Sequence, residues 1–218
     1  MNKIKSSIPQ VGGGFSRGLL LRLKANLHLQ GPYKDVEFAL KCIMECIEMN
    51  RADFETDKIP DYFLAPDEFI LINMLAVAYK ELEGLPKAIE IWLKLKANYQ
   101  KNYTVNIQTF NHPAYRDLTA NIALALLHSL RFAECLDVAE ENAVMALQQH
   151  DMKTYSRCLH QKAFCLMKLG RTDEGKEWYK KFLMFAYALD GYAAINFETV
   201  KKEYTDNFGE PLELSVGW

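Results

Sequence analysis

Long hydrophobic runs are missing from this 218-residue sequence. The most apolar stretch near its start, GLLLRLKANLHL, is interrupted by Arg22 and Lys24. Because a membrane-spanning helix needs about 20 consecutive apolar residues, the sequence predicts no membrane segment. The stretch also lacks a small-residue cleavage site and therefore does not resemble a secretory signal, although the absence of acids before Asp35 leaves a mitochondrial presequence as an alternative.

Cysteine is sparse and shows no disulfide pattern. The five cysteines are an odd number, and all fall within helix-like segments. This usage is typical of a reducing compartment, so we expect a cytoplasmic protein. Cys42 and Cys46 lie one helical turn apart, but no second pair of ligands is near them. We expect both to be buried core thiols.

Motifs for catalysis and for cofactors are also missing. The five histidines are scattered without the spacing of a metal site, and no glycine-rich phosphate loop follows a strand. Cys158 and His160 could pair as nucleophile and base, but residues two apart on a helix face different directions. We expect no metal, no cofactor and no catalytic centre, and hence a protein that is not an enzyme.

No charge of either sign dominates. The formal net charge is −2, half of the residues are hydrophobic and a quarter are charged, as in ordinary globular proteins. Such a balance provides no global field that would attract nucleic acid or an anionic membrane, so we expect this chain to bind neither directly. Only the segment before Asp35 is basic.

The sequence does contain a helical period of about 3.6 along most of its length, without an alternating strand pattern. In LAVAYKELEGLPKAIEIW, small residues fall at Ala76 and Ala88, where paired helices can approach closely, and the rings of Tyr79 and Trp92 can fill the space between neighbouring pairs. Gly84 is expected to end the first helix in the left-handed conformation. This spacing is typical of a tetratricopeptide repeat.

One such unit cannot bury its apolar face alone, so we expect the pattern to recur. Two weaker copies do follow. The second contains Thr119, Ile122, Ala123, Leu126, Cys135 and Ala139, with a turn at Leu130 and Arg131. The third contains Leu159, Lys162, Ala163, Leu166, Gly175 and Tyr179, with a turn at Gly170. A closing helix carries an apolar stripe of Ala193, Phe197, Val200 and Tyr204 and a polar outer face of Glu198, Lys201, Lys202 and Glu203.

The predicted fold class is all-α, a right-handed solenoid of tetratricopeptide-like helix pairs over residues 15–208 that ends in a capping helix. Residues 1–14 are expected to be a flexible basic segment and residues 209–218 a loose tail. A first pair of helices is expected at Phe15–Gln30 and Tyr33–Met49, followed by an irregular connection at Arg51–Ala65 and a helix that begins at Pro66.

Three stretches carry a family resemblance: DYFLAPDEFILINMLAVAYKELEGLPKAIEIW, LHQKAFCLMKLGRTDEGKEWYKKFLMFAYAL and VKKEYTDNFGEPLEL. Together they resemble the C-terminal regulatory region of Firmicutes helix-turn-helix transcription regulators of the Xre, Rgg and PlcR-like kind, from Val36 to Leu214. The resemblance implies a peptide-responsive regulatory domain and a homodimer, formed through C-terminal helices that carry Trp178, Phe185 and Tyr192. The segment before Val36 is too short for the DNA-binding head of such regulators, so the resemblance does not extend to DNA binding.

In a helical array of this kind, the first helix of each pair lines the inner surface. The residues that face away from the packing stripe are the candidate peptide-binding residues: Asn73, Val77 and Lys80, then Asn121 (or Ala120), Leu124 and His128, then Arg157, His160 and Phe164. Amides can bond to a peptide backbone and apolar groups can hold its side chains. The alternative is that these residues line an inner surface that binds no ligand.

The predicted function is a non-enzymatic, ligand-sensing regulatory domain that binds a short peptide or protein segment in its concave groove. One alternative is a scaffold that holds a protein partner without any small effector. A second is a regulator of response-regulator phosphatase chemistry, for which the N-terminal segment is too short to form the required helical bundle.

Overall fold

The computed structural model describes residues 13–31, 33–103, 112–188, 197–209 and 211. The chain divides into two compact units, Met1–Ala114 and Tyr115–Trp218. Each unit is built from helices, and the described residues contain no strand, which confirms the predicted all-α class.

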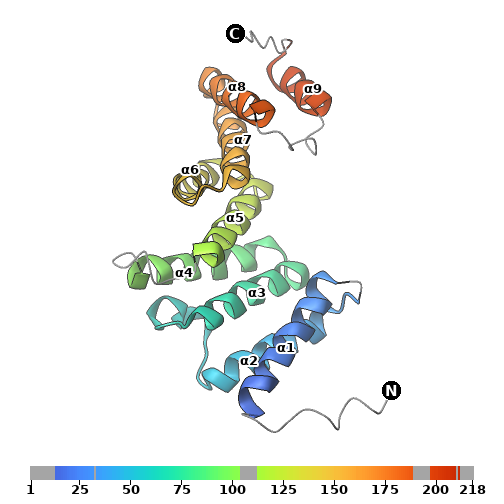
Figure 1. Ribbon diagram of the computed structural model, residues 1–218, viewed down its shortest axis with the longest axis vertical. Helices are drawn as coiled ribbons and strands as arrows, with labels where there is room; N and C mark the ends of the chain where they lie inside the picture. The colour runs from blue at the N-terminus through green and yellow to red at the C-terminus, as the bar shows by residue number, and fades with distance from the viewer. Residues whose placement is uncertain (1–12, 32, 104–111, 189–196, 210, 212–218) are drawn as a thin grey trace. The chain divides into compact units, whose positions relative to one another are not determined.

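The first unit consists of consecutive helices that pack in chain order (Figure 1). Its elements are α1 (Gly13–Gln30), α2 (Val36–Asn50), the 3-10 helix η1 (Thr56–Asp61), α3 (Pro66–Leu82) and α4 (Leu85–Tyr103). Helices α1 and α2 pack together, α3 packs with α4, and α2 joins the two pairs by packing on α3. The predicted first pair is present, although α2 begins at Val36, after the cap Asp35, rather than at Tyr33, and the predicted start at Pro66 is confirmed.

The second unit repeats this arrangement. Its elements are α5 (His112–His128), which begins just before the unit boundary, α6 (Phe132–Gln148), α7 (Met152–Lys168), α8 (Thr172–Ala188) and α9 (Phe197–Phe208). Helix α7 packs on both α6 and α8. The expected closing helix is present as α9, whose buried Tyr204 joins a core cluster with Tyr179, Phe182 and Leu183. Ala193 lies outside the described residues.

Each predicted repeat pair has one small buried residue in each of its two helices, twelve positions apart, and in the second and third pairs the helices approach closely there. These pairs are Ala76 with Ala88, Ala123 with Cys135, and Ala163 with Gly175. In the second pair, the Cys135 thiol donates a hydrogen bond of 3.2 Å to the Ala123 carbonyl oxygen. In the third, a Cβ placed on Gly175 would lie 3.0 Å from the Ala163 carbonyl oxygen, so the two backbones leave no room for a larger side chain.

Several turns between consecutive helices use left-handed backbone. Gly84 has φ 91° and Gly170 has φ 79°, as their positions in the sequence predict. Leu130 (φ 58°) and His150 (φ 55°) adopt the same region without being glycine, a conformation that costs L-residues about 1 kcal/mol. In these two turns the packing of the flanking helices overrides the local preference.

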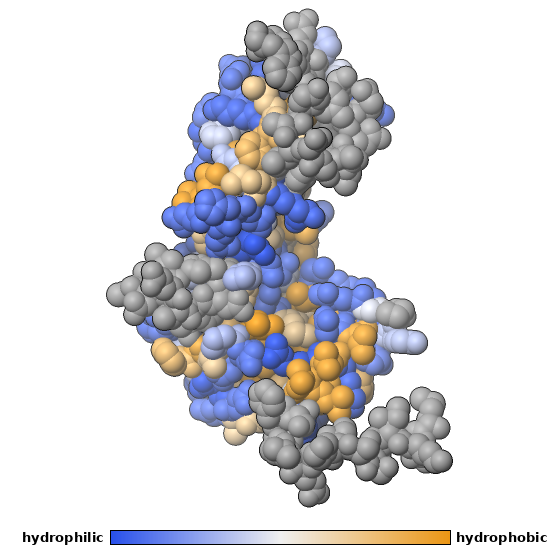
Figure 2. All heavy atoms as spheres, viewed as in Figure 1, coloured by the Kyte–Doolittle hydropathy of each residue, from blue (hydrophilic) through white to orange (hydrophobic). Residues whose placement is uncertain are grey.

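Among the described residues, a row of exposed leucines lies on α1. Leu19, Leu20, Leu23 and Leu27 are each about half exposed. Figure 2 shows the corresponding hydrophobic area over α1. Of the described helices, none is both long and apolar enough to cross a membrane.

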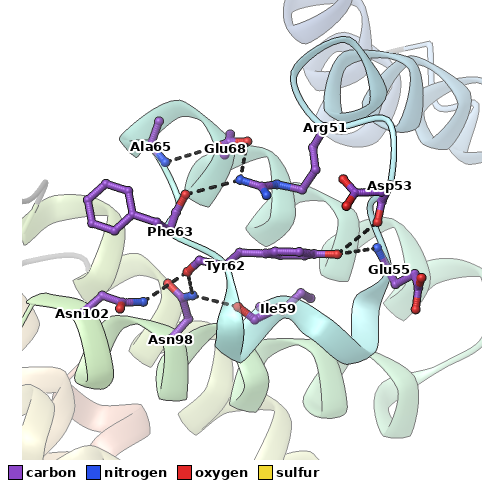
Figure 3. A network of polar contacts seen from close by, with 10 residues as sticks. All are labelled: Arg51, Asp53, Glu55, Ile59, Tyr62, Phe63, Ala65, Glu68, Asn98 and Asn102. Atoms are coloured by element: carbon purple, nitrogen blue, oxygen red, sulfur yellow. Dashed lines mark hydrogen bonds and ion pairs between the residues drawn. The ribbon is translucent and has the colours of Figure 1, made fainter.

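The connection between α2 and α3 is held in place by polar contacts (Figure 3). The buried Asn98 of α4 donates hydrogen bonds of 2.7 Å to the Ile59 carbonyl oxygen and 2.6 Å to the Tyr62 carbonyl oxygen. The Tyr62 hydroxyl accepts from the Glu55 N–H and donates to the Asp53 carbonyl oxygen. This segment, expected to be irregular, thus contains a 3-10 helix whose backbone is bonded to α4.

We predict that Asn98→Ala lowers the free energy of unfolding by about 2 kcal/mol, because two buried carbonyl oxygens lose a donor. Asn98→Asp should lower the free energy of unfolding further, since a carboxylate cannot donate a hydrogen bond and would face the same two oxygens. The matched control is Asn102→Ala, which removes a half-buried bond of 3.2 Å to a carbonyl oxygen that Asn98 also serves. Urea unfolding measures the free energy of unfolding of all three variants. Equal losses of stability for Asn98→Ala and Asn102→Ala would contradict the prediction.

Candidate functional site

A polar groove of about 440 Å³ lies in the second unit between α5 and α7, with α6 behind it. Helices α5 and α7 are the first helices of two consecutive pairs, the position that the sequence predicts for a ligand-binding surface. The lining residues are Arg116, Asp117, Ala120, Asn121, Leu124, Asn142, Asp151, Lys153, Thr154, Arg157, Cys158 and Gln161.

An ion pair crosses the groove between its two walls. Arg116 Nη1 of α5 lies 2.6 Å from Asp151 Oδ2, at the N-cap of α7. Asp151 also accepts hydrogen bonds from the Thr154 N–H (3.0 Å) and from the Thr154 hydroxyl (2.8 Å). The cap therefore starts α7 and fixes its first turn next to α5.

The environment of Asp151 favours its charged form. Burial opposes ionisation, but the two hydrogen bonds from Thr154 and the positive charges of Arg116 and Arg157 outweigh it and lower the pKa of Asp151. The carboxylate is therefore ionised at neutral pH and neutralises Arg116.

The innermost part of the groove contains Asn142 and Cys158. Asn142 of α6 is 2% exposed, and its side-chain oxygen Oδ1 has no hydrogen-bond partner. Burial raises the pKa of the Cys158 thiol to about 12, so this thiol is protonated at neutral pH. Cys158 therefore lacks the thiolate that a nucleophile or a metal ligand requires.

Three of the predicted residues meet in this groove. Asn121 and Leu124 of α5 face Arg157 of α7, and Ala120, the alternative to Asn121, lines the groove as well. His128 lies exposed in the last turn of α5, outside the lining. The wall residues thus combine an amide, an aliphatic side chain and a guanidinium group.

His160 and Phe164 instead lie where α9 meets α7. His160 Nε2 is 3.0 Å from Glu203 Oε1 of α9, and the His160 ring is 4.9 Å from the ring of Phe182. Phe164 lines a separate, shallower hollow with Lys202, Glu203, Asp206 and Asn207. Glu203, expected on the polar outer face of the closing helix, is half-buried against α7.

The remaining predicted residues lie on α3 in the first unit. Asn73 Oδ1 accepts a hydrogen bond of 2.8 Å from the Trp92 indole N–H, which links α3 to α4. Val77 is half-buried, and Lys80 lies 3.1 Å from Glu81. The groove of this unit, about 370 Å³, is lined by none of these three but by Gly18, Leu19, Arg22, Cys46, Met49, Asn50, Asp67 and Leu71.

The cysteines have the packing role expected of them. Cys42 and Cys46 are both buried, and burial raises the pKa of each thiol. Within the described ranges, no three His, Cys, Asp or Glu residues gather as a metal site would require.

The residues expected at a dimer interface pack within the second unit. Two ammonium groups lie close to the Trp178 ring, with Lys162 Nζ at 3.8 Å and Lys181 Nζ at 4.2 Å from its centroid. Phe185 packs edge-on against Tyr155, and Tyr192 falls outside the described residues. The homodimer remains a prediction.

No protein-family model matches the sequence, and no curated protein matches it. Solved structures do resemble the fold. The tetratricopeptide-like repeats of a kinesin light chain from Podosopora anserina match 89% of this chain and 86% of theirs, with a TM-score of 0.65 and 14% identity. Aspartyl phosphate phosphatase F from Bacillus subtilis matches 89% of this chain and 46% of its own, with a TM-score of 0.66 and 13% identity.

PlcR from Bacillus thuringiensis, crystallised with the peptide PapR7 and DNA, aligns with a TM-score of 0.47 and 15% identity, over 91% of this chain and 70% of its own. A TM-score below 0.5 does not establish a common fold, so the assignment rests on the first two structures. They place the chain among tetratricopeptide-like helical repeat folds, as predicted from the spacing of small and aromatic residues.

We predict that acidification loosens α9. The hydrogen bond with His160 outweighs burial and lowers the pKa of Glu203, so this contact stabilises the fold above the ordinary glutamate pKa of 4.5 and is lost as the pH falls through the lowered value. Melting temperatures between pH 7 and pH 3 should fall less for Glu203→Gln than for the parent. Glu177→Gln, an exposed change on α8, should follow the parent, and identical slopes for all three proteins would contradict the prediction.

Proposed function

We propose that the chain is a non-enzymatic, ligand-sensing regulatory domain whose groove between α5 and α7 binds a short extended peptide or protein segment. The observation that supports it most is the joint lining of that groove by Asn121, Leu124 and Arg157, which come from the first helices of two consecutive pairs. The resemblance of the sequence to peptide-responsive transcription regulators makes a peptide effector the first choice and suggests origin within such a regulator.

The groove has the chemistry that an extended peptide requires. The amides of Asn121 and Gln161 can donate to and accept from a peptide backbone, Leu124 offers an aliphatic contact, and Arg157 offers a positive charge. The volume of about 440 Å³ accommodates a few residues of a peptide rather than a folded domain.

Binding would act through the spacing of α5 and α7. A ligand that touches both helices favours the spacing at which both sets of contacts form, and the Arg116–Asp151 pair at 2.6 Å opposes wider separations. Only a difference in affinity between two spacings can shift the balance between them.

The alternative is a scaffold that holds a segment of a larger protein in the same groove and senses no small effector. Its occupant would be a stoichiometric protein partner. Affinity purification of the full chain from cell extract distinguishes the alternatives, because a scaffold retains that partner while a sensor is saturated by the peptide alone.

We predict that the full chain retains members of a random hexapeptide pool, measured by affinity selection and mass spectrometry, with dissociation constants then obtained by calorimetry. Leu124→Ser should raise the dissociation constant about tenfold, the effect of losing roughly 1.4 kcal/mol of apolar contact. Val144→Ser is the matched control, since Val144 is a similarly exposed aliphatic residue on α6 outside the groove. Absence of any retained peptide would refute peptide binding, and equal effects of the two variants would refute the assignment to this groove.

A further inference from the structure

The floor of the groove carries a hydrogen-bond acceptor that the fold leaves unused. Asn142 is almost completely buried on α6, lines the groove, and its Oδ1 has no partner. A buried carbonyl oxygen without a donor destabilises a protein, and an aliphatic residue at this position would avoid that cost. The oxygen itself is shielded from solvent, so a ligand N–H group at the floor of the groove would satisfy the acceptor once the soft terminal amide torsion turns the oxygen toward the groove.

Asn142 differs in this respect from Asn98 of the first unit. The Asn98 side-chain oxygen is also without a partner, but its amide nitrogen bonds to two carbonyl oxygens and holds η1 against α4. The burial of Asn98 is therefore explained by the fold. No equivalent contact with a described residue explains Asn142.

The wall of the groove carries a positive charge, that of Arg157, that acts on Asp151 through space but forms no direct ion pair. Three cations and two carboxylates line the groove. Arg116 is matched by Asp151 at 2.6 Å and by Asp117 at 3.8 Å. Within the described part of the chain, Arg157 forms neither an ion pair nor a hydrogen bond and is exposed. Its guanidinium group is therefore available to a ligand anion.

We infer that this groove selects a peptide that bears a carboxylate close to a backbone N–H, with the carboxylate on Arg157 and the N–H donating to Asn142 Oδ1. The inference rests on the proposed function and adds the chemistry of the ligand to it. A guanidinium group pairs well with a carboxylate, and a buried amide oxygen accepts well from a peptide N–H. Leu124 and Ala120 contact the adjoining side chain of the peptide.

Two sources supply this chemistry, namely a free C-terminal carboxylate and the side chain of an internal Asp or Glu. Three hexapeptide pools separate them in affinity selection on the full chain. The first has free C termini and no acidic residues, the second is the same pool with amidated C termini, and the third is amidated with one fixed internal Asp. We expect strong retention from the first or the third pool and at least tenfold less from the second.

Two groove variants test the residues. Arg157→Gln should weaken binding of the retained carboxylate peptides about tenfold or more and leave binding of their neutral counterparts unchanged, whereas Lys168→Gln, an exposed change on α7 outside the groove, should alter neither. Asn142→Leu should raise the melting temperature while weakening binding of the same peptides at least tenfold. A purely structural asparagine would not combine these two effects.

The outcomes separate the inference from the proposed function. Retention of all three pools to the same extent, or equal binding by the parent, Arg157→Gln and Asn142→Leu, overturns the inference and leaves peptide binding in place. Retention from none of the pools overturns both. Retention confined to the carboxylate pools, with the loss in both variants, supports the inference and identifies the source of the carboxylate.

Discussion

The close approach of paired helices at small residues is the constraint on which the rest of the structure depends. In the second and third repeat pairs, two small residues twelve positions apart let the backbones approach closely, as the contact between Cys135 and the Ala123 carbonyl shows. A Cβ on Gly175 would lie 3.0 Å from the Ala163 carbonyl oxygen and 3.1 Å from the Met167 nitrogen, so even an alanine side chain would crowd the backbone of α7. This approach sets α6 directly behind α5 and α7, so that α6 forms the floor of the groove while the other two helices form its walls.

Local features of the sequence were sufficient to predict the helices and most of their ends. The helical period, Pro66 at the start of α3 and Gly84 and Gly170 at turns all act within a few residues, and the structure has each of them as expected. Contacts between distant segments were not predictable in this way. His160 was expected on the inner surface, but α9, whose Glu203 is 43 positions further along the chain, folds back over it.

The helical period of the sequence predicted only those groove residues that lie on the first helix of a pair and point away from its packing stripe. Asn121, Leu124 and Arg157 were found because they face away from the packing stripe of a first helix. Asn142 was missed because it lies on a second helix, among residues that the period assigns to packing. The Arg116–Asp151 pair was missed because its partners are 35 positions apart, although Asp151 followed by Thr154 is a recognisable helix start.

Stacking and ligand chemistry are carried by different residues in the second unit. The helices are held together by small and aromatic residues such as Ala163 and Tyr179, which are fully buried and contribute no polar group to the groove. Of the polar groups that line the groove, the Arg116–Asp151 pair links α5 to α7, while Asn142 opposes the packing. In the proposed function, substitutions at other positions of the groove wall, such as Leu124, would change which peptide is bound without altering the stack. The same separation of roles allows one helical repeat to carry many binding specificities.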